Sequence, residues 1–145
     1  MKIIAHRGNI NGPKSEFENS PNYIDIALKT YDCEIDVWVI GNNVLLGHDY
    51  GKYEVDHKWL DQRKNKLWIH CKNYGAMNLF CGTTFNYFWH DTDDYTMTSA
   101  GYIWAYPGKE NVRDRTVLVM PERVWSKEYY TKIKCFGICS DYCVL

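Results

Sequence analysis

The sequence contains no CxxC pair, although it has six cysteines, at positions 33, 71, 81, 135, 139 and 143. Close cysteine pairs are typical of structural zinc sites, so their absence makes such a site the least favoured interpretation. Disulfides form in oxidising compartments and are the second alternative. Because three of the cysteines lie inside apolar, strand-like runs, we expect buried free thiols in a reducing cytosol.

The chain also lacks any apolar segment long enough for a signal peptide or a membrane helix. It lacks an excess of charge of either sign, since 17 Lys and Arg face 18 Asp and Glu. This balance produces no bulk field that would draw the protein to nucleic acid or to an anionic membrane. We therefore expect a soluble cytoplasmic protein with no nucleic-acid or membrane partner.

No internal repeat and no low-complexity linker interrupts the 145 residues. A chain of this length can bury a sizeable core, which predicts a single domain over residues 1–145. Aromatic residues supply 16% of the chain, including twelve Tyr and six Trp. They can fill this core or form the wall of a ligand pocket.

Short strands alternate with loops or short helices along the whole chain. Strands are expected at about 2–5, 34–40, 44–47, 67–71, 86–90, 102–105, 116–120 and 135–139, and helices at about 22–31, 56–63, 75–80 and 126–132. Alternation of this kind is typical of a parallel sheet joined by crossover connections. The pattern therefore predicts an α/β fold.

Nearly every expected strand ends in a polar or ionisable group. These groups are His6-Arg7, Glu34-Asp36, His48-Asp49, His70-Lys72, His90-Asp91, Tyr106, Glu122 and Ser140-Asp141. In a (β/α) barrel the C-terminal strand ends form the active-site face. Four of the five histidines lie at such ends, and only His57 does not. The pattern favours a barrel-like arrangement with a site at this face.

Glu34 and Asp36 stand one residue apart inside the apolar run CEIDVWV. Residues i and i+2 of a strand point to the same face, so both carboxylates would aim at one spot. Two carboxylates this close repel each other unless a cation lies between them or one takes up a proton. The alternative is a solvated strand face, just as His6 could be a hydrogen-bonded structural residue.

The motifs IAHRG, ENSPNYIDIAL, CEIDVWV and LLGHD, in this order, resemble the N-terminal signature of the glycerophosphodiester phosphodiesterases. That family belongs to a superfamily with the phosphatidylinositol-specific phospholipases C. The resemblance covers residues 3–49, weakens at 67–73 and returns in GICSDYCVL, at about 137–142. It implies a (β/α) TIM-barrel-like fold, and a small phosphodiester as the substrate.

The chain is far shorter than the roughly 250 residues of a typical (β/α)₈ barrel. The resemblance therefore implies a compact, reduced barrel with few helices in the C-terminal half. Such a barrel could be incomplete or completed by a second copy, and its exposed strand edges would favour a homo-oligomer.

The resemblance also implies roles for individual residues. His6 and His48 match the general acid and base, and two imidazoles can divide these roles near neutral pH. Arg7 matches the motif arginine, which can grip a phosphate oxygen. Glu34 and Asp36 match acids that bind one divalent metal ion (Mg²⁺, Ca²⁺ or Mn²⁺), which would stabilise charge in the transition state.

The stretch LWIHCKN departs from the family pattern. His70 stands where the family usually has a metal-binding glutamate, while Lys72 keeps the lysine that follows and could contact the phosphate. An imidazole ligand favours Mn²⁺, Fe²⁺, Co²⁺ or Zn²⁺ over Mg²⁺ and Ca²⁺. The alternative is that His70 faces the substrate and that another acid, such as Glu122, completes the metal site.

Other residues carry weaker expectations. Trp104 and Tyr106 could form a pocket wall or pack in the core, and Glu122 could touch the site. His90 with Asp91, Asp93 and Asp94 could form a second metal patch, but a solvated acidic loop is favoured. Asp141 matches the family's closing strand, where we expect it to be architectural rather than catalytic.

Together these features predict a metal-dependent phosphodiester hydrolase that acts on a glycerophosphodiester-like or other small phosphodiester by His/His acid–base catalysis. One alternative is a lyase, as in the phospholipases C, that forms a cyclic phosphate. Another is a non-catalytic module that binds phosphoesters. The two motif histidines argue against the last, because binding alone needs no acid–base pair.

Overall fold

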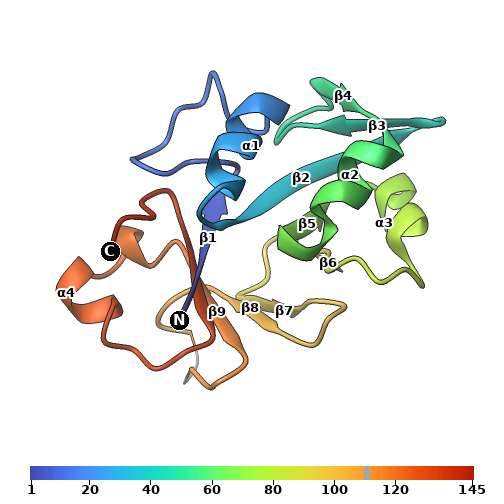
Figure 1. The fold of residues 1–145 in the computed structure, drawn as a ribbon. Helices are drawn as coiled ribbons and strands as arrows, with labels where there is room; N and C mark the ends of the chain where they lie inside the picture. Colours follow the sequence, from blue (N-terminus) through green and yellow to red (C-terminus); the bar gives the residue numbers. More distant parts are fainter. Residues whose placement is uncertain (110–111) are drawn as a thin grey trace.

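The computed structural model describes residues 1–109 and 112–145. Its strands are β1 (Lys2–His6), β2 (Asp32–Ile40), β3 (Asn43–Leu46), β4 (Tyr53–Val55), β5 (Leu67–Cys71), β6 (Tyr87–Phe88), β7 (Tyr95–Met97), β8 (Ile103–Ala105), β9 (Thr116–Val119) and β10 (Gly137–Ser140). Its helices are α1 (Pro21–Leu28), α2 (His57–Arg63), α3 (Tyr74–Phe80) and α4 (Lys127–Tyr130), with 3₁₀ turns η1 (Lys64–Lys66) and η2 (Pro121–Arg123). The prediction of a mixed α/β fold with few helices after α3 is confirmed (Figure 1).

All strands belong to one curled mixed sheet. Seven of them run parallel in the order β6-β5-β2-β1-β10-β9-β8. The antiparallel strand β7 pairs with β8, and the meander β3-β4 extends from the second half of β2. The parallel strands therefore bring all their C-terminal ends to the same edge.

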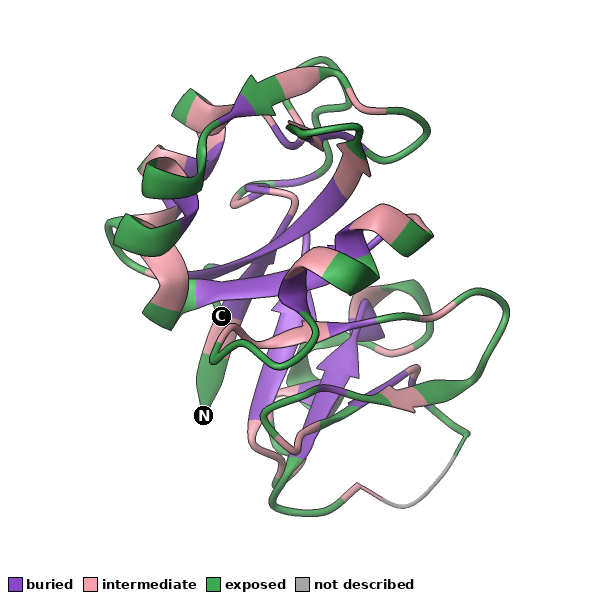
Figure 2. Cartoon of the chain, turned by 90° about the vertical axis from the view of Figure 1, so that its right-hand side faces the viewer, coloured by how far each residue is buried: buried purple, intermediate pink, exposed green. Residues whose placement is uncertain are grey.

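The two faces of the sheet carry different cores, because side chains alternate along each strand. One cluster, called the inner cluster here, gathers Ile4, Trp68, Phe88, Trp104, Val117, Val119, Met120 and Cys139. The opposite face buries Ile35, Ile69 and Cys71 against α1, α2 and α3. Figure 2 shows the buried residues concentrated along the central strands, with exposed residues on the loops and outer helix surfaces.

The inner cluster joins the two ends of the parallel series. Among the described residues, β6 pairs only with β5, and β8 pairs with β7 and β9. The Phe88 and Trp104 rings nevertheless lie 4.6 Å apart, and Trp68 of β5 lies 5.8 Å from Trp104. No ladder joins β6 to β8 in the described part of the chain, so this packing connects them, together with hydrogen bonds between Tyr87 of β6 and Ser99 in the turn between β7 and β8.

A buried polar contact closes the N-terminal end of the inner face. Asp32 accepts hydrogen bonds from the Trp68 indole N–H at 3.1 Å and from the Lys2 ammonium at 3.4 Å. Paired in this way, a carboxylate that is 5% exposed avoids the cost of an uncompensated buried charge.

Several element boundaries differ from the sequence-based predictions. Strands β4 and β7 were not predicted, because each has only three residues and most of these residues are exposed or half-buried. The helix expected to reach residue 31 ends at Leu28, and the one expected over 126–132 has only four residues. The final strand lies at 137–140 rather than 135–139. Short segments carry too few residues for periodicity to locate their ends.

Four of the six cysteines (Cys33, Cys71, Cys139 and Cys143) are buried, and all six are free thiols. Burial raises the pKa of Cys71 and of Cys143 to about 12, so these thiols stay protonated at neutral pH and pack as small apolar groups. Within the described residues, no helix has the length and apolar character needed to cross a membrane.

Trp104→Ala should lower the free energy of unfolding by about 3–5 kcal/mol, because it opens a cavity between β5, β6 and β8. Trp89→Ala is the matched control, since Trp89 is 43% exposed whereas Trp104 is 3% exposed. It should cost less than about 1 kcal/mol. Urea denaturation of both variants measures the difference, and equal losses would show that the inner cluster does not join β6 to β8.

Candidate functional site

Three buried ionisable side chains meet where the C-terminal end of β5 lies beside the middle of β2. The strand register places Asp36 beside His70 and Glu34 beside His6. One donor atom each from Glu34, Asp36 and His70 lies within 4.8 Å of the others. Because all the parallel strands end at this edge, the neighbouring polar residues predicted from β1 and β10 lie here too.

Asp36 is the most heavily contacted member of this cluster. Its Oδ2 accepts a hydrogen bond from Asn19 Nδ2 at 2.9 Å and faces Arg7 Nε at 3.0 Å. Its Oδ1 lies 3.1 Å from His70 Nδ1 and 3.9 Å from Lys72 Nζ. Burial alone would raise the pKa of Asp36, but the His70 hydrogen bond and the Arg7 charge hold it well below its usual value.

The pKa of Glu34 is shifted in the opposite direction to that of Asp36. Burial, and then the charge of Asp36, raise the pKa of Glu34 above its usual value. Its Oε2 accepts a hydrogen bond from the Arg7 backbone N–H at 3.3 Å, and its Oε1 lies 4.0 Å from His70 Nδ1. Of the two carboxylates, Glu34 is therefore the one that more readily takes up a proton when no cation lies between them.

Arg7 and Asn19 adopt left-handed backbone conformations, with φ of 54° and 64°. Such angles are uncommon outside glycine and often mark functional sites. The Asn19 N–H donates to the Arg7 carbonyl at 3.0 Å, and the Asn19 side chain holds both the N–H and the carboxylate of Asp36. Sequence reasoning missed Asn19, because the stretch 9–19 looks like an ordinary polar loop.

His6 forms a buried pair with Asp141. His6 Nδ1 lies 2.8 Å from Asp141 Oδ1, which also accepts a hydrogen bond from Asn9 Nδ2 at 2.8 Å. Burial disfavours the charged form of His6, but the hydrogen bond to Asp141 and the charge of Glu34 outweigh it and raise the pKa of His6. Asp141, expected to be architectural, thus contacts a candidate catalytic residue directly.

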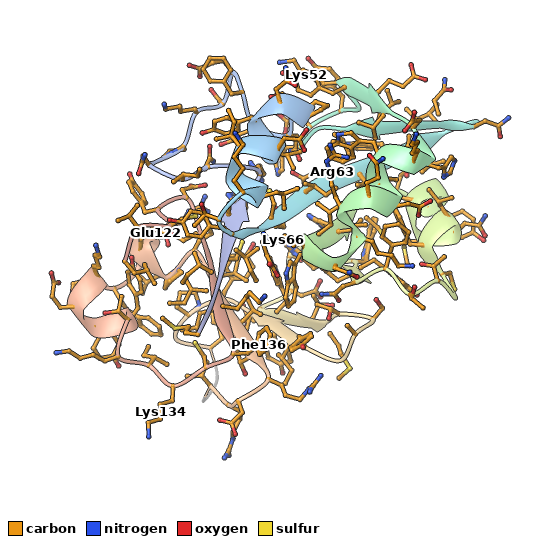
Figure 3. All side chains as sticks on the ribbon, in the orientation of Figure 1. Lys52, Arg63, Lys66, Glu122, Lys134 and Phe136 are labelled. Carbon is orange, nitrogen blue, oxygen red and sulfur yellow. The ribbon has the colours of Figure 1, made fainter. Side chains whose placement is uncertain are left out.

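Glu122 supports this pair from the start of η2. Its Oε1 accepts hydrogen bonds from the Ser140 hydroxyl at 2.8 Å and from the Asp141 N–H at 3.0 Å. Its contacts are therefore to β10 and the residue that follows it, outside the Glu34–Asp36–His70 cluster. Figure 3 labels Glu122 beside η2, away from Lys134 and Phe136, which precede β10 at the other end of the strands.

His48 lies outside the buried cluster. Its side chain is 45% exposed and its Nδ1 lies 2.7 Å from Asp49 Oδ1. It lines a polar cavity of about 270 Å³ together with Arg7, Ser15, Glu18, Asn19, Gly47, Asp49, Tyr50 and Lys52. A hydrogen bond of 3.1 Å from the Gly47 N–H to the Asp36 carbonyl ties this loop to β2. His48 thus shares this cavity with Arg7 and Asn19, whereas Glu34, Asp36, His70 and His6 do not line it.

The residues after β6 and β8 flank His70. The His90 ring stacks on the His70 ring with centroids 4.4 Å apart, and Tyr106 meets His90 edge-on at 6.0 Å. Burial, and then the charge of His70, lower the pKa of His90 to about 4. Trp104 lies in the inner cluster and is a core residue, whereas half-buried Tyr106 borders the site.

The three acids that follow His90 do not converge on it. Asp91, Asp93 and Asp94 are all exposed, and the one group of metal-ligating type found in the described part of the chain is Glu34–Asp36–His70. The segment is thus an exposed acidic loop, in which Asp94 lies 3.3 Å from Lys109 Nζ.

The donor atoms of the cluster fit a divalent cation. Nitrogen and oxygen ligands lie about 2.0–2.2 Å from such an ion, so two of them on one ion are about 3–4 Å apart. His70 Nδ1 lies 3.1 Å from Asp36 Oδ1 and 4.0 Å from Glu34 Oε1. A cation between them would also relieve the carboxylate repulsion that raises the pKa of Glu34.

A larger groove of about 1040 Å³ lies at the N-terminal end of the strands. Lys2, Lys66, Lys132 and Lys134 line it, and Figure 3 labels two of these lysines. Lys2 is paired with Asp32, and Lys66 donates to the Leu28 carbonyl at 2.6 Å. The residues that line the groove include two acids, Asp32 and Asp114, but no histidine, unlike those at the opposite edge.

A scan against models of protein families found no match for this chain, and searches of curated proteins and of solved structures also returned none. Its functional interpretation therefore depends on its own residues and their geometry.

Asp141→Asn should lower the pKa of His6 in the metal-free protein, because an amide stabilises the imidazolium less than a carboxylate does. An NMR titration of the histidine ring protons measures this pKa. Asp49→Asn is the matched control, since Asp49 pairs with exposed His48 and should leave the His6 titration unchanged. An unchanged His6 pKa in Asp141→Asn would contradict the assigned pair.

Proposed function

We propose that this chain is a metal-dependent phosphodiesterase built on a reduced (β/α) barrel-like sheet. Seven parallel strands follow one another around the curled sheet, and the inner cluster fills the space between β6 and β8. The polar residues gather at the C-terminal strand ends, which is where barrel enzymes carry their active sites. The loops and short helices after β5 account for the small size of the chain.

One observation carries this proposal. Two buried carboxylates and an imidazole converge at a spacing suited to one cation, with Arg7 and Lys72 beside them. A phosphodiester has one negative charge, which guanidinium and ammonium groups can neutralise. The same edge holds His6, whose Nδ1 is occupied by Asp141, so its Nε2 remains for proton transfer.

The reaction needs one group to remove a proton from the attacking water and another to protonate the leaving alkoxide. His6 is proposed as the proton donor, because its pKa is raised, which favours the protonated form. His48, at the mouth of the polar cavity that also contains Arg7, is proposed as the base. Asp141 and Asn9 hold the His6 ring in place throughout.

Glu34, Asp36 and His70 are proposed to hold the divalent cation, which when bound supplies positive charge to the phosphate oxygens. An imidazole among the ligands favours Mn²⁺, Fe²⁺, Co²⁺ or Zn²⁺ over Mg²⁺ and Ca²⁺. The cavity of about 270 Å³ beside Arg7 is small and polar. It suits a small hydrophilic diester such as a glycerophosphodiester.

A phosphoester-binding module is the second candidate, and one observation favours it. Asp36 is already contacted by three potentially cationic side chains, Arg7, His70 and Lys72. If these neutralise the carboxylates without a metal ion, the site could bind a phosphate group without cleaving the diester. Such a module would keep its affinity for diesters when His6 or His48 is replaced, and would show no turnover.

His6→Ala and His48→Ala should each lower kcat/KM by about 10²–10⁴-fold, because each removes one proton-transfer group. The assay is hydrolysis of bis(p-nitrophenyl) phosphate and of a panel of glycerophosphodiesters by metal-stripped protein, to which single divalent cations are returned. His57→Ala is the control, since His57 is exposed at the start of α2. Full activity in either site variant would refute the assigned roles.

His70→Glu should shift the metal preference toward Mg²⁺ and Ca²⁺, because a third carboxylate replaces the nitrogen ligand. The ratio of activity with Mn²⁺ to activity with Mg²⁺ measures the change. His57→Glu introduces the same substitution on the surface and should leave the ratio as in the unsubstituted protein. An unchanged ratio in active His70→Glu protein would exclude His70 as a ligand.

A further inference from the structure

Two rings lie nearly parallel to the His70 ring and also beside each other, with the Phe88 and His90 centroids 6.0 Å apart. The Phe88 ring lies 5.2 Å from the His70 ring at an interplanar angle of 9°, and the His90 ring lies 4.4 Å from it at 10°. The register of β5 and β6 pairs His70 with Phe88, and His90 lies two residues further on. Residues two apart in extended chain share a face, so both rings reach His70 from the same segment.

Both ring nitrogens of His70 face hydrogen-bond acceptors, so a cation would replace the hydrogen on Nδ1 while the His90 carbonyl keeps the one on Nε2. His70 Nε2 lies 3.3 Å from the His90 carbonyl oxygen. A carbonyl oxygen only accepts hydrogen bonds, so this contact requires a hydrogen on Nε2. The opposite ring nitrogen, Nδ1, faces the carboxylates, at 3.1 Å from Asp36 Oδ1 and 4.0 Å from Glu34 Oε1.

From this arrangement we infer that His90 is a positioning residue that presents Nδ1 of His70, rather than Nε2, to a divalent cation. The inference rests on the metal site proposed above and adds the atom that binds and the residue that orients it. The stacked ring of His90 limits tilting of the imidazole, and its carbonyl distinguishes the two ring orientations. A flipped ring would place a C–H group against this carbonyl and leave Nε2 without it.

One ring nitrogen of His90 makes no hydrogen bond within the described part of the chain, whereas the ring as a whole stacks on His70. Its Nδ1 is buried and has no hydrogen-bond partner among the described residues. A buried polar atom without a partner is unfavourable. A phenylalanine at this position would keep the stacking surface without that atom, so it should preserve the orientation of His70.

NMR of protein labelled with ¹⁵N-histidine, before and after addition of Zn²⁺ to metal-stripped protein, tests which nitrogen binds. We expect His70 Nδ1 to move to the shift of a metal-bound nitrogen while Nε2 keeps its proton. Zn²⁺ bound through Nε2, or a His70 ring unaffected by Zn²⁺, would overturn the inference.

The contribution of the His90 ring is tested by Zn²⁺ affinity in competition with a chelator. His90→Ala should weaken binding by about 10–100-fold, as is typical when a residue that orients a ligand is removed, and His90→Phe should restore it. Trp89→Ala, which alters the exposed neighbour, is the control and should bind as the unsubstituted protein does. Unchanged affinity in His90→Ala, or no rescue by His90→Phe, would overturn this role.

These measurements separate the inference from the proposed activity. Zn²⁺ bound through Nδ1 in a protein that cleaves no diester would support the role of His90 and refute the phosphodiesterase. Metal-dependent cleavage with His70 bound through Nε2 would support the phosphodiesterase and overturn the role of His90.

Discussion

The structure depends on the two carboxylates that β2 carries into the interior. Glu34 and Asp36 lie on a strand paired on both sides, to β1 and to β5, and they are 3% and 0% exposed. Two buried acids on one face are unfavourable unless positive charge or hydrogen-bond donors surround them. Three groups meet this requirement: Arg7 in its left-handed turn, the side-chain amide of Asn19 and the imidazole of His70. The same three groups surround the carboxylates and so form the site.

The inner cluster packs on the same face of the sheet as the site, nearer the N-terminal ends of the strands. Trp68, Phe88 and Trp104 pack at ring distances of 4.6–5.8 Å across the part of the sheet where no ladder joins β6 to β8. The ladder with β5 holds the end of β6, and with it His90, beside His70, and the packing of Phe88 on Trp104 joins β6 to β8. A short chain with few helices after α3 can thus keep its strand ends together through aromatic side chains. Part of the high aromatic content of the chain therefore has a structural role, in the packing between β6 and β8.

Sequence patterns predicted the parallel strands and most of the site, because both depend on local signals. Acids spaced by two residues in an apolar run predict a shared face, and His70 and Lys72 follow a clear strand. Asn19, Asn9 and the contact of Asp141 with His6 could not be predicted, since they join positions 17–135 residues apart with no periodic signal. The exposed position of His48 was missed for a related reason, because a motif gives order along the chain but not depth in the fold.

The central claim is that Glu34, Asp36 and His70 form a cation site that presents a metal ion to a phosphate group. The most direct measurement is anomalous X-ray scattering from crystals soaked with Mn²⁺ and inorganic phosphate. We predict one manganese peak between these three side chains, with phosphate density beside it and within reach of Arg7. Strong manganese peaks elsewhere and none at these residues would contradict the account.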